Sequence, residues 1–192
     1  EGHYHGWLDN AFWNYAPPLD QAGPPEDPVA IPASRGQVAS DGDNLVIRPW
    51  NNLDLVRQAF DRHPGQIAAV MCEPIMCNTG AILPQPGYLQ GLRDLCTQHG
   101  ALLIFDEIIT GFRVALGGAQ QLFGVTPDLA TFAKGMAGGF PVSALAGRRQ
   151  YMQSLGDLSI THSGTYNSNG PCMAATVAAL DIDGEASRRD DG

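Results

Sequence analysis

Three short, continuous apolar runs stand out in the pattern of hydrophobic and polar positions. Each is followed directly by a charged side chain, and the runs cover Ile67–Cys72, Ala101–Phe105 and Leu129–Ala133. Continuous apolar runs of this length are typical of strands that are buried on both faces of a parallel sheet. We therefore predict three buried strands at these positions. Weaker strand patterns cover residues 45–48 and 142–146.

Segments with a helical period separate the predicted strands. We predict helices over residues 52–60, 86–99, 118–123 and 169–180. Asn52 is suited to cap the first helix, and Gly100 lies just past the end of the second. Alternating strands and helices predict an α/β fold with a mostly parallel sheet flanked by helices.

The first 50 residues have a different composition. Proline and glycine recur throughout them, including the pairs Pro17-Pro18 and Pro24-Pro25, and this excludes a long helix or a central strand. We predict a loop-rich entry segment over residues 1–50 and the main α/β region over residues 51–192. Long loops in compact domains are often functional.

Charge and cysteine content narrow the class of protein. The chain has 20 acidic and 11 basic residues and a formal net charge of −9, which argues against binding to nucleic acid or to an anionic membrane. No apolar run has the length of a membrane span. Four cysteines do not form a disulfide framework, and Cys72 and Cys77 lack a second ligand pair at zinc spacing. We predict reduced thiols, no metal site and a cytoplasmic location.

Lys134 is the only lysine among the 11 basic residues. It follows an apolar run and precedes a glycine-rich segment, and this setting suggests a desolvated amine. Such an amine is a nucleophile that is suited to Schiff-base chemistry. The alternative is a lysine that extends from a strand end into water.

The charged residues after the predicted strands suggest one crevice, because ligands of open α/β sheets bind beyond the carboxyl ends of the strands. A carboxylate at Asp106 could pair with a cationic ring nitrogen. Alternatively, Asp106 caps a helix or forms an ion pair with Arg113. Glu107 is the better candidate for that ion pair. An imine-forming lysine and a carboxylate that pairs a pyridine nitrogen are the two requirements of pyridoxal phosphate catalysis. Ser163-Gly164-Thr165 offers N–H groups and hydroxyls for the phosphate.

The sequence contains four informative motifs, which in chain order are Glu73-Pro-Ile-Met-Cys-Asn-Thr-Gly, Leu103-Ile-Phe-Asp-Glu-Ile-Ile-Thr-Gly-Phe-Arg, Pro127-Asp-Leu-Ala-Thr-Phe-Ala-Lys-Gly and Gly138-Gly-Phe-Pro-Val. Together they resemble the class III pyridoxal-phosphate-dependent aminotransferases, and most closely the branch that contains glutamate-1-semialdehyde 2,1-aminomutase. The resemblance implies the large domain of a fold-type I enzyme. It also implies that this chain is a central piece, which lacks an N-terminal segment and the C-terminal small domain of the family.

The resemblance implies roles for the residues that match the motifs. Lys134 matches the Schiff-base lysine and Asp106 the partner of the pyridine nitrogen. Ile108 matches the residue that packs on one face of the cofactor ring, and Tyr4 matches the aromatic side chain on the other face. The alternative for Tyr4 is an aromatic residue packed within a loop.

Three further positions carry weaker expectations. Asn78 matches the residue near the ring hydroxyl, and Thr165, which follows Gly164, matches the threonine that reaches the phosphate of the neighbouring subunit in the family's homodimer. The alternatives are a turn residue and a helix cap. Glu73 matches a family position to which we assign no chemical role.

The implied activity is transfer of an amino group from a small-molecule donor to a keto or aldehyde acceptor through the Lys134 Schiff base. Intramolecular transfer, as in glutamate-1-semialdehyde 2,1-aminomutase, is an alternative. The segments Trp7-Leu8-Asp9 and Tyr166-Asn167 depart from that enzyme's pattern. A catalytically incomplete piece is a further alternative. A cofactor-independent Schiff-base enzyme such as an aldolase would use Lys134 but leave Asp106 without a purpose.

Overall fold

The computed structural model describes the backbone of residues 1–190 and the side chains of residues 1–184. The chain forms two compact units, of which the first covers Glu1–Ala101 and the second begins at Leu102. The two units are described separately.

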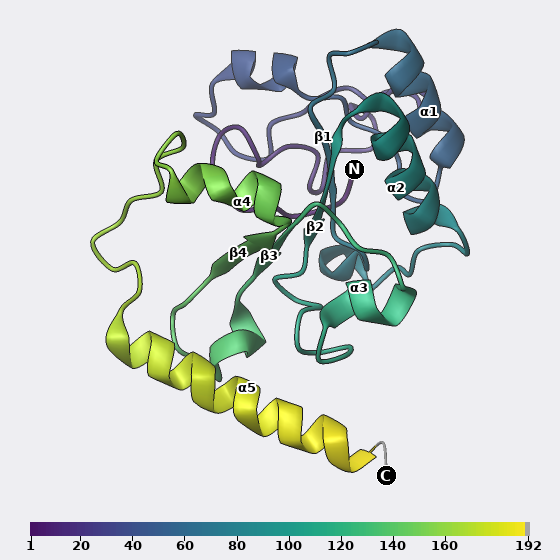
Figure 1. Ribbon diagram of the computed structural model, residues 1–192. Coiled ribbons are helices and arrows are strands. Elements are labelled where there is room, and N and C mark those ends of the chain that lie inside the picture. Colours follow the sequence, from purple (N-terminus) through teal and green to yellow (C-terminus); the bar gives the residue numbers. More distant parts are fainter. Residues whose placement is uncertain (191–192) are drawn as a thin grey trace. The chain divides into compact units, whose positions relative to one another are not determined.

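The first unit contains two α-helices and one strand (Figure 1). In chain order its elements are the 3₁₀ helix η1 (Ala39–Asn44), α1 (Leu53–Arg62), β1 (Ala69–Cys72), the 3₁₀ helix η2 (Cys77–Thr79) and α2 (Tyr88–His99). The predicted cap is confirmed, because the Asn52 side chain accepts a hydrogen bond from the Leu55 N–H at 3.1 Å. Gly100 ends α2 in the left-handed region, at a φ of 70°, which glycine adopts without strain.

Hydrogen bonds from side chains organise the first 50 residues. The Asn14 side chain is buried; it accepts from the Ile31 N–H at 2.7 Å and donates to the Val29 carbonyl at 2.8 Å. The predicted strand at residues 45–48 is wrong. The Arg48 carbonyl accepts instead from the amino group of Glu1 at 3.0 Å, and the Arg48 guanidinium donates to the Ile47 carbonyl at 2.6 Å. The backbone carbonyls of Ile47 and Arg48, which a neighbouring strand would otherwise pair, thus accept their hydrogen bonds from groups in loops.

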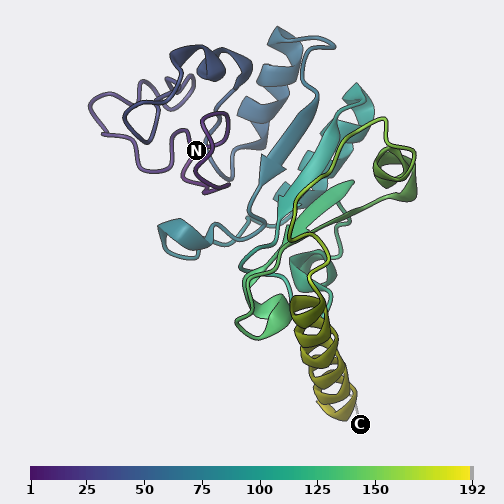
Figure 2. The same ribbon diagram turned by 90° about the vertical axis from the view of Figure 1, so that its left-hand side faces the viewer.

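The second unit holds three strands in one sheet (Figure 1). Its elements are β2 (Leu102–Asp106), α3 (Gly118–Phe123), β3 (Leu129–Phe132), the 3₁₀ helix η3 (Lys134–Ala137), β4 (Ala144–Gly147), α4 (Arg149–Gly156) and α5 (Gly170–Asp190). Strand β3 pairs in parallel with β2 and antiparallel with β4. The predicted α/β fold is confirmed. Figure 2 shows these strands from the side, with α5 leading away from them.

Helix α3 has the predicted bounds, whereas α4 was not predicted and α5 is longer than expected. Buried side chains of α1 and α2 form the core of the first unit. Leu103 and Phe105 on β2 are fully buried in the second unit. The expectation of strands buried on both faces is wrong for β1 and β3, because each buries only one of its four residues. Among the described residues, no helix is long and apolar enough to cross a membrane.

Candidate functional site

The Asp106 carboxylate lies at the carboxyl end of β2 and is 5% exposed. Its Oδ1 atom accepts a hydrogen bond from the Ile108 N–H at 3.1 Å and one from the Thr131 hydroxyl at 3.3 Å. Asp106 and Thr131 are register partners of the parallel pair β2–β3. A buried carboxylate that is held by donors from its own loop and from the neighbouring strand has a fixed orientation.

Lys134 follows the end of β3 by two residues, so it lies at the same edge of the parallel pair as Asp106. It is the first residue of η3 and adopts a positive φ of 45°. Its side chain is exposed in the described part of the chain. The prediction of a desolvated Lys134 amine is therefore wrong there. The reason is local: Gly135 continues a 3₁₀ turn, which takes Lys134 out of the apolar strand.

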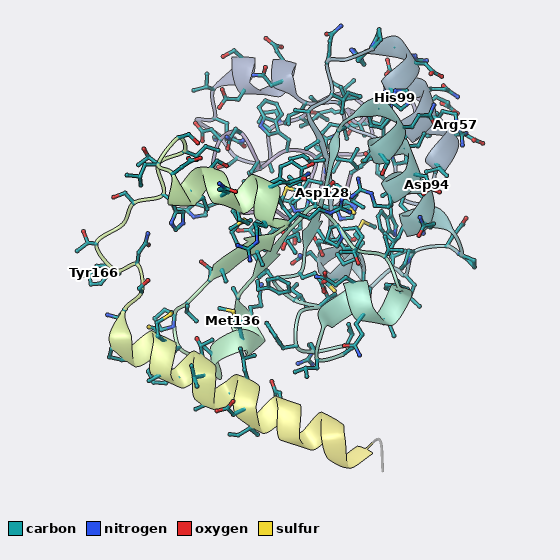
Figure 3. All side chains as sticks on the ribbon, viewed as in Figure 1. Arg57, Asp94, His99, Asp128, Met136 and Tyr166 are labelled. Atoms are coloured by element: carbon teal, nitrogen blue, oxygen red, sulfur yellow. The ribbon has the colours of Figure 1, made fainter. Side chains whose placement is uncertain are left out.

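The predicted phosphate-binding residues lie on the exposed loop between α4 and α5. The Gly164 carbonyl accepts from the Asn167 N–H at 3.0 Å, which closes a turn around Thr165. The neighbouring Tyr166 is 82% exposed and can be found on this loop in Figure 3. A loop in front of a helix was predicted here, and that arrangement is confirmed. The roles of Gly164 and Thr165 remain predictions.

The first unit brings Tyr4 and Asn78 to one carboxylate. Glu73 Oε1 accepts from the Tyr4 N–H at 2.8 Å and from the Asn78 side-chain amide at 3.1 Å. The Tyr4 ring also packs edge-on against Phe12 and Tyr15, with ring centroids 5.6 Å and 5.5 Å apart. Sequence reasoning assigned Glu73 no role. Its signals were its position directly after a predicted strand and its place at the start of the first family motif.

Glu107 is a second buried carboxylate whose role the sequence did not indicate. It is fully buried, and it accepts hydrogen bonds from the Thr110 hydroxyl at 2.8 Å and the Ala119 N–H at 2.5 Å. It also accepts from the Gln120 N–H at 3.2 Å and side-chain amide at 3.0 Å. The proposed pairing of Glu107 with Arg113 is therefore wrong, because both carboxylate oxygens hold the start of α3.

Burial changes the protonation of one histidine in the first unit. His3 lies edge-on to Trp50, with ring centroids 4.9 Å apart, and its Nδ1 accepts from the Glu73 N–H at 3.1 Å. Desolvation, together with the smaller effects of the N-terminal ammonium and His5, lowers the pKa of His3 to about 3. The ring is consequently neutral at physiological pH, as the acceptor role of Nδ1 requires.

A depression of about 600 Å³ opens in the second unit, on the side of β3 and β4 that Phe112 and Phe132 line. Its polar lining includes Asp128, which is labelled in Figure 3 and pairs with the Arg148 guanidinium at 3.3 Å. Neither Asp106 nor Lys134 lines it. Among the residues with described side chains, no group of three or more His, Cys, Asp or Glu could hold a metal ion.

A family model described as aminotransferase class-III matches residues 26–187. This chain belongs to the class-III aminotransferase family. Two glutamate-1-semialdehyde 2,1-aminomutases are each 44% identical to it: that of Nitratidesulfovibrio vulgaris over 182 residues, and the second such protein of Brevibacillus brevis over 181 residues. Each match covers 94% of this chain and 41% of the relative, so the chain spans about two-fifths of the length of these curated relatives.

Solved structures of transaminases share the fold. An omega-transaminase from Sphaerobacter thermophilus has 33% identity and a TM-score of 0.85, with 95% of this chain and 42% of that chain covered. A structure titled as a transaminase with PLP bound has 30% identity and a TM-score of 0.83, with 94% and 42% covered. The expected fold-type I architecture is therefore confirmed for this chain.

Proposed function

We propose that this chain carries part of the cofactor site of a pyridoxal-phosphate-dependent enzyme that transfers amino groups. The observation that carries the proposal is the placement of Asp106 and Lys134 at one edge of the parallel pair β2–β3. When bound, pyridoxal phosphate supplies an aldehyde that captures amines and a protonated ring that accepts electrons. A primary amine and an oriented, buried carboxylate are the two groups that this chemistry requires.

In this proposal each residue has a separate task. Lys134 would hold the cofactor aldehyde through its Nζ, with loss of water, and its amine, once released by the substrate, would carry the proton from the substrate carbon to the cofactor carbon. Asp106 would keep a proton on the ring nitrogen, because its fixed carboxylate stabilises the cationic form. Ile108 would pack on one face of the ring. Tyr4 would cover the other face, and Asn78 would contact the ring hydroxyl.

The loop that contains Gly164 and Thr165 is proposed to bind the phosphate of a neighbouring subunit in a homodimer. The exposed position of this loop is compatible with a partner outside the chain. We also propose a location in the cytoplasm, where the thiols of the four cysteines would stay reduced. The proposed substrates are a small-molecule amino donor and a keto or aldehyde acceptor. We further propose that the chain is the central part of the large domain, preceded by an N-terminal segment and followed by a small domain.

The identity to two glutamate-1-semialdehyde 2,1-aminomutases favours a second candidate, which is amino transfer within one molecule. The two activities differ in their need for a second substrate. An aminomutase converts glutamate-1-semialdehyde when no other amino donor or acceptor is present, whereas a transaminase requires one. Turnover of that compound alone separates the candidates, and no turnover with either set of substrates supports a catalytically incomplete piece.

The first experiment is titration of the chain with pyridoxal phosphate, followed by borohydride reduction and peptide mapping. Because Lys134 is the only lysine, a label on a lysine side chain identifies it without ambiguity. We expect a shifted visible absorption band and a label on the peptide that contains Lys134. The Lys134→Ala variant should lose both the band and the label. A folded wild-type chain without either would contradict the proposal.

A further inference from the structure

The Glu73 carboxylate, which is 3% exposed, is the meeting point of three segments of the first unit. Its Oε1 accepts from the Tyr4 N–H at 2.8 Å and from Asn78 Nδ2 at 3.1 Å, and its Oε2 accepts from the Cys77 N–H at 2.8 Å. Tyr4 is 69 residues away along the chain, and Asn78 is five residues away. One carboxylate oxygen therefore joins the N-terminal loop to the loop after β1.

The contact also fixes how the Asn78 side chain is turned. A carboxylate only accepts hydrogen bonds, so the atom of the Asn78 amide that faces Glu73 must be the nitrogen. The second N–H and the oxygen of the amide then point elsewhere. Asn78 is exposed, and an exposed amide without this anchor would sample several rotamers.

The backbone of Glu73 extends the same arrangement. Its N–H donates to His3 Nδ1 at 3.1 Å. His3 directly precedes Tyr4, whose N–H donates to the Glu73 carboxylate. Glu73 thus contacts consecutive residues of the N-terminal loop with two different groups. This double contact sets the position of the Tyr4 backbone relative to the end of β1.

We infer that Glu73 is a positioning residue, which uses one carboxylate oxygen to hold Tyr4 and Asn78 in the arrangement that binds the cofactor ring. The inference rests on the proposed function, because it takes Tyr4 and Asn78 as ring contacts. In this inference Glu73 does not itself contact the ring. Its effect on the cofactor passes through the backbone of Tyr4 and the side chain of Asn78.

The first test compares Glu73→Met with Glu73→Gln. Methionine has a similar length and no acceptor, so it removes the contacts to Tyr4 and Asn78. We expect the Kd for pyridoxal phosphate, measured by absorbance, to rise about tenfold, the change that the loss of one net hydrogen bond produces. Glutamine retains one oxygen for Tyr4 and Asn78, and the Kd should stay within about threefold of wild type.

A double-mutant cycle distinguishes positioning from general support of the fold. If Glu73 acts through Asn78, Glu73→Met should raise the Kd less in the Asn78→Ala background than in wild type. The matched control is Glu107→Met, which removes a carboxylate that is equally buried but holds α3. Its effect on the Kd should add to that of Asn78→Ala. Additivity for both glutamates would overturn the inference.

Amide hydrogen exchange in the cofactor-free chain supplies a readout that does not depend on binding. In Glu73→Gln the amide oxygen can serve Tyr4 and Asn78 together, and the new NH₂ group then faces the Cys77 N–H. We expect faster exchange at Cys77 and retained protection at Tyr4. The opposite pattern, or a tenfold weaker Kd in this variant, would contradict the inference even if Glu73→Met fails to fold.

The outcomes separate this inference from the proposed function. A wild-type chain that does not bind pyridoxal phosphate overturns the proposed function, and the inference with it. A wild-type chain that binds, together with a Glu73→Met variant that binds equally well, overturns the inference alone.

Discussion

The Thr131 hydroxyl donates a hydrogen bond to the Asp106 carboxylate at 3.3 Å, across a register pair of the parallel strands β2 and β3. The strand that leads to Lys134 thus also orients the carboxylate at the end of the neighbouring strand. The relative position of the two proposed catalytic residues depends on this pairing.

Thr131→Val should therefore weaken both stability and cofactor binding. Valine has the same shape and suits a strand, but it removes the donor to a charged, buried acceptor. We expect the free energy of unfolding to fall by about 1–2 kcal/mol, as measured by urea denaturation. Thr131→Ser keeps the hydroxyl and is the control. Equal losses in the two variants would show that the hydroxyl is not responsible.

Asp106→Asn should separate cofactor binding from turnover. The amide can still contact a ring nitrogen, but it no longer stabilises a positive charge there. We expect pyridoxal phosphate to remain bound while amino transfer slows at least ~100-fold, the scale for the loss of one preorganised electrostatic contact. Rates per bound cofactor test this. Asp94→Asn, an exposed position on α2, is the control and should leave the rate unchanged.

His3 should make the first unit less stable as the pH falls. The pKa of His3 is about 3 in the folded chain and ordinarily near 6.5, so the unfolded chain binds the proton first. Between pH 6.5 and 3 the unfolded state is favoured progressively, by up to about 1.4 kcal/mol per pH unit. Above pH 6.5 this effect vanishes. Urea unfolding at pH 7 and at pH 5 measures the difference.

The control for this pH effect is His3→Asn, which keeps an acceptor near the Glu73 N–H but does not titrate. Its unfolding free energy should drop by about 2 kcal/mol less than that of wild type between pH 7 and pH 5. Parallel pH profiles for the two proteins would exclude His3 as the source.

Glu107→Gln should destabilise the second unit. Both oxygens of Glu107 face backbone N–H donors, from Ala119 and Gln120, so either orientation of the glutamine amide opposes a donor with a donor. We expect a loss of about 1–3 kcal/mol in urea unfolding, the cost of one unsatisfied buried group. Gln121→Ala removes an exposed contact to the Gly117 N–H and should cost less than about 1 kcal/mol. A comparable loss in both variants would argue against a special role of the buried carboxylate.

The sequence predicted those elements whose signals are local. Asn52 as a cap and Gly100 as a helix end are single-residue signals, and both were found in the structure. Helix α4 has neither a side-chain cap nor a buried residue, and it was missed. The strand expected at residues 45–48 is absent, and the Arg48 carbonyl accepts a hydrogen bond from the amino group of Glu1, which is far away in sequence.

In the candidate site, too, the sequence predicted the residues with local signals and missed the contacts between distant segments. Motifs identified Asp106 and Lys134, but the Thr131 contact depends on strand register, which no pattern of a single strand reveals. The exposure of Lys134 follows from a turn conformation rather than from the apolar run before it. The shared oxygen of Glu73 joins residues 69 positions apart, and composition carries no trace of such a contact.

Gly118 lies against the Glu107 carboxylate at a φ of +69°, and a Cβ atom there would overlap Oε2. Position 118 is consequently restricted to glycine on two separate grounds: the positive φ disfavours any residue with a side chain, and the Glu107 carboxylate occupies the space that a Cβ atom would need. In protein design, a shorter residue at position 107 would relieve the overlap but not the backbone strain. Position 118 is therefore one to hold as glycine while the rest of this loop is varied.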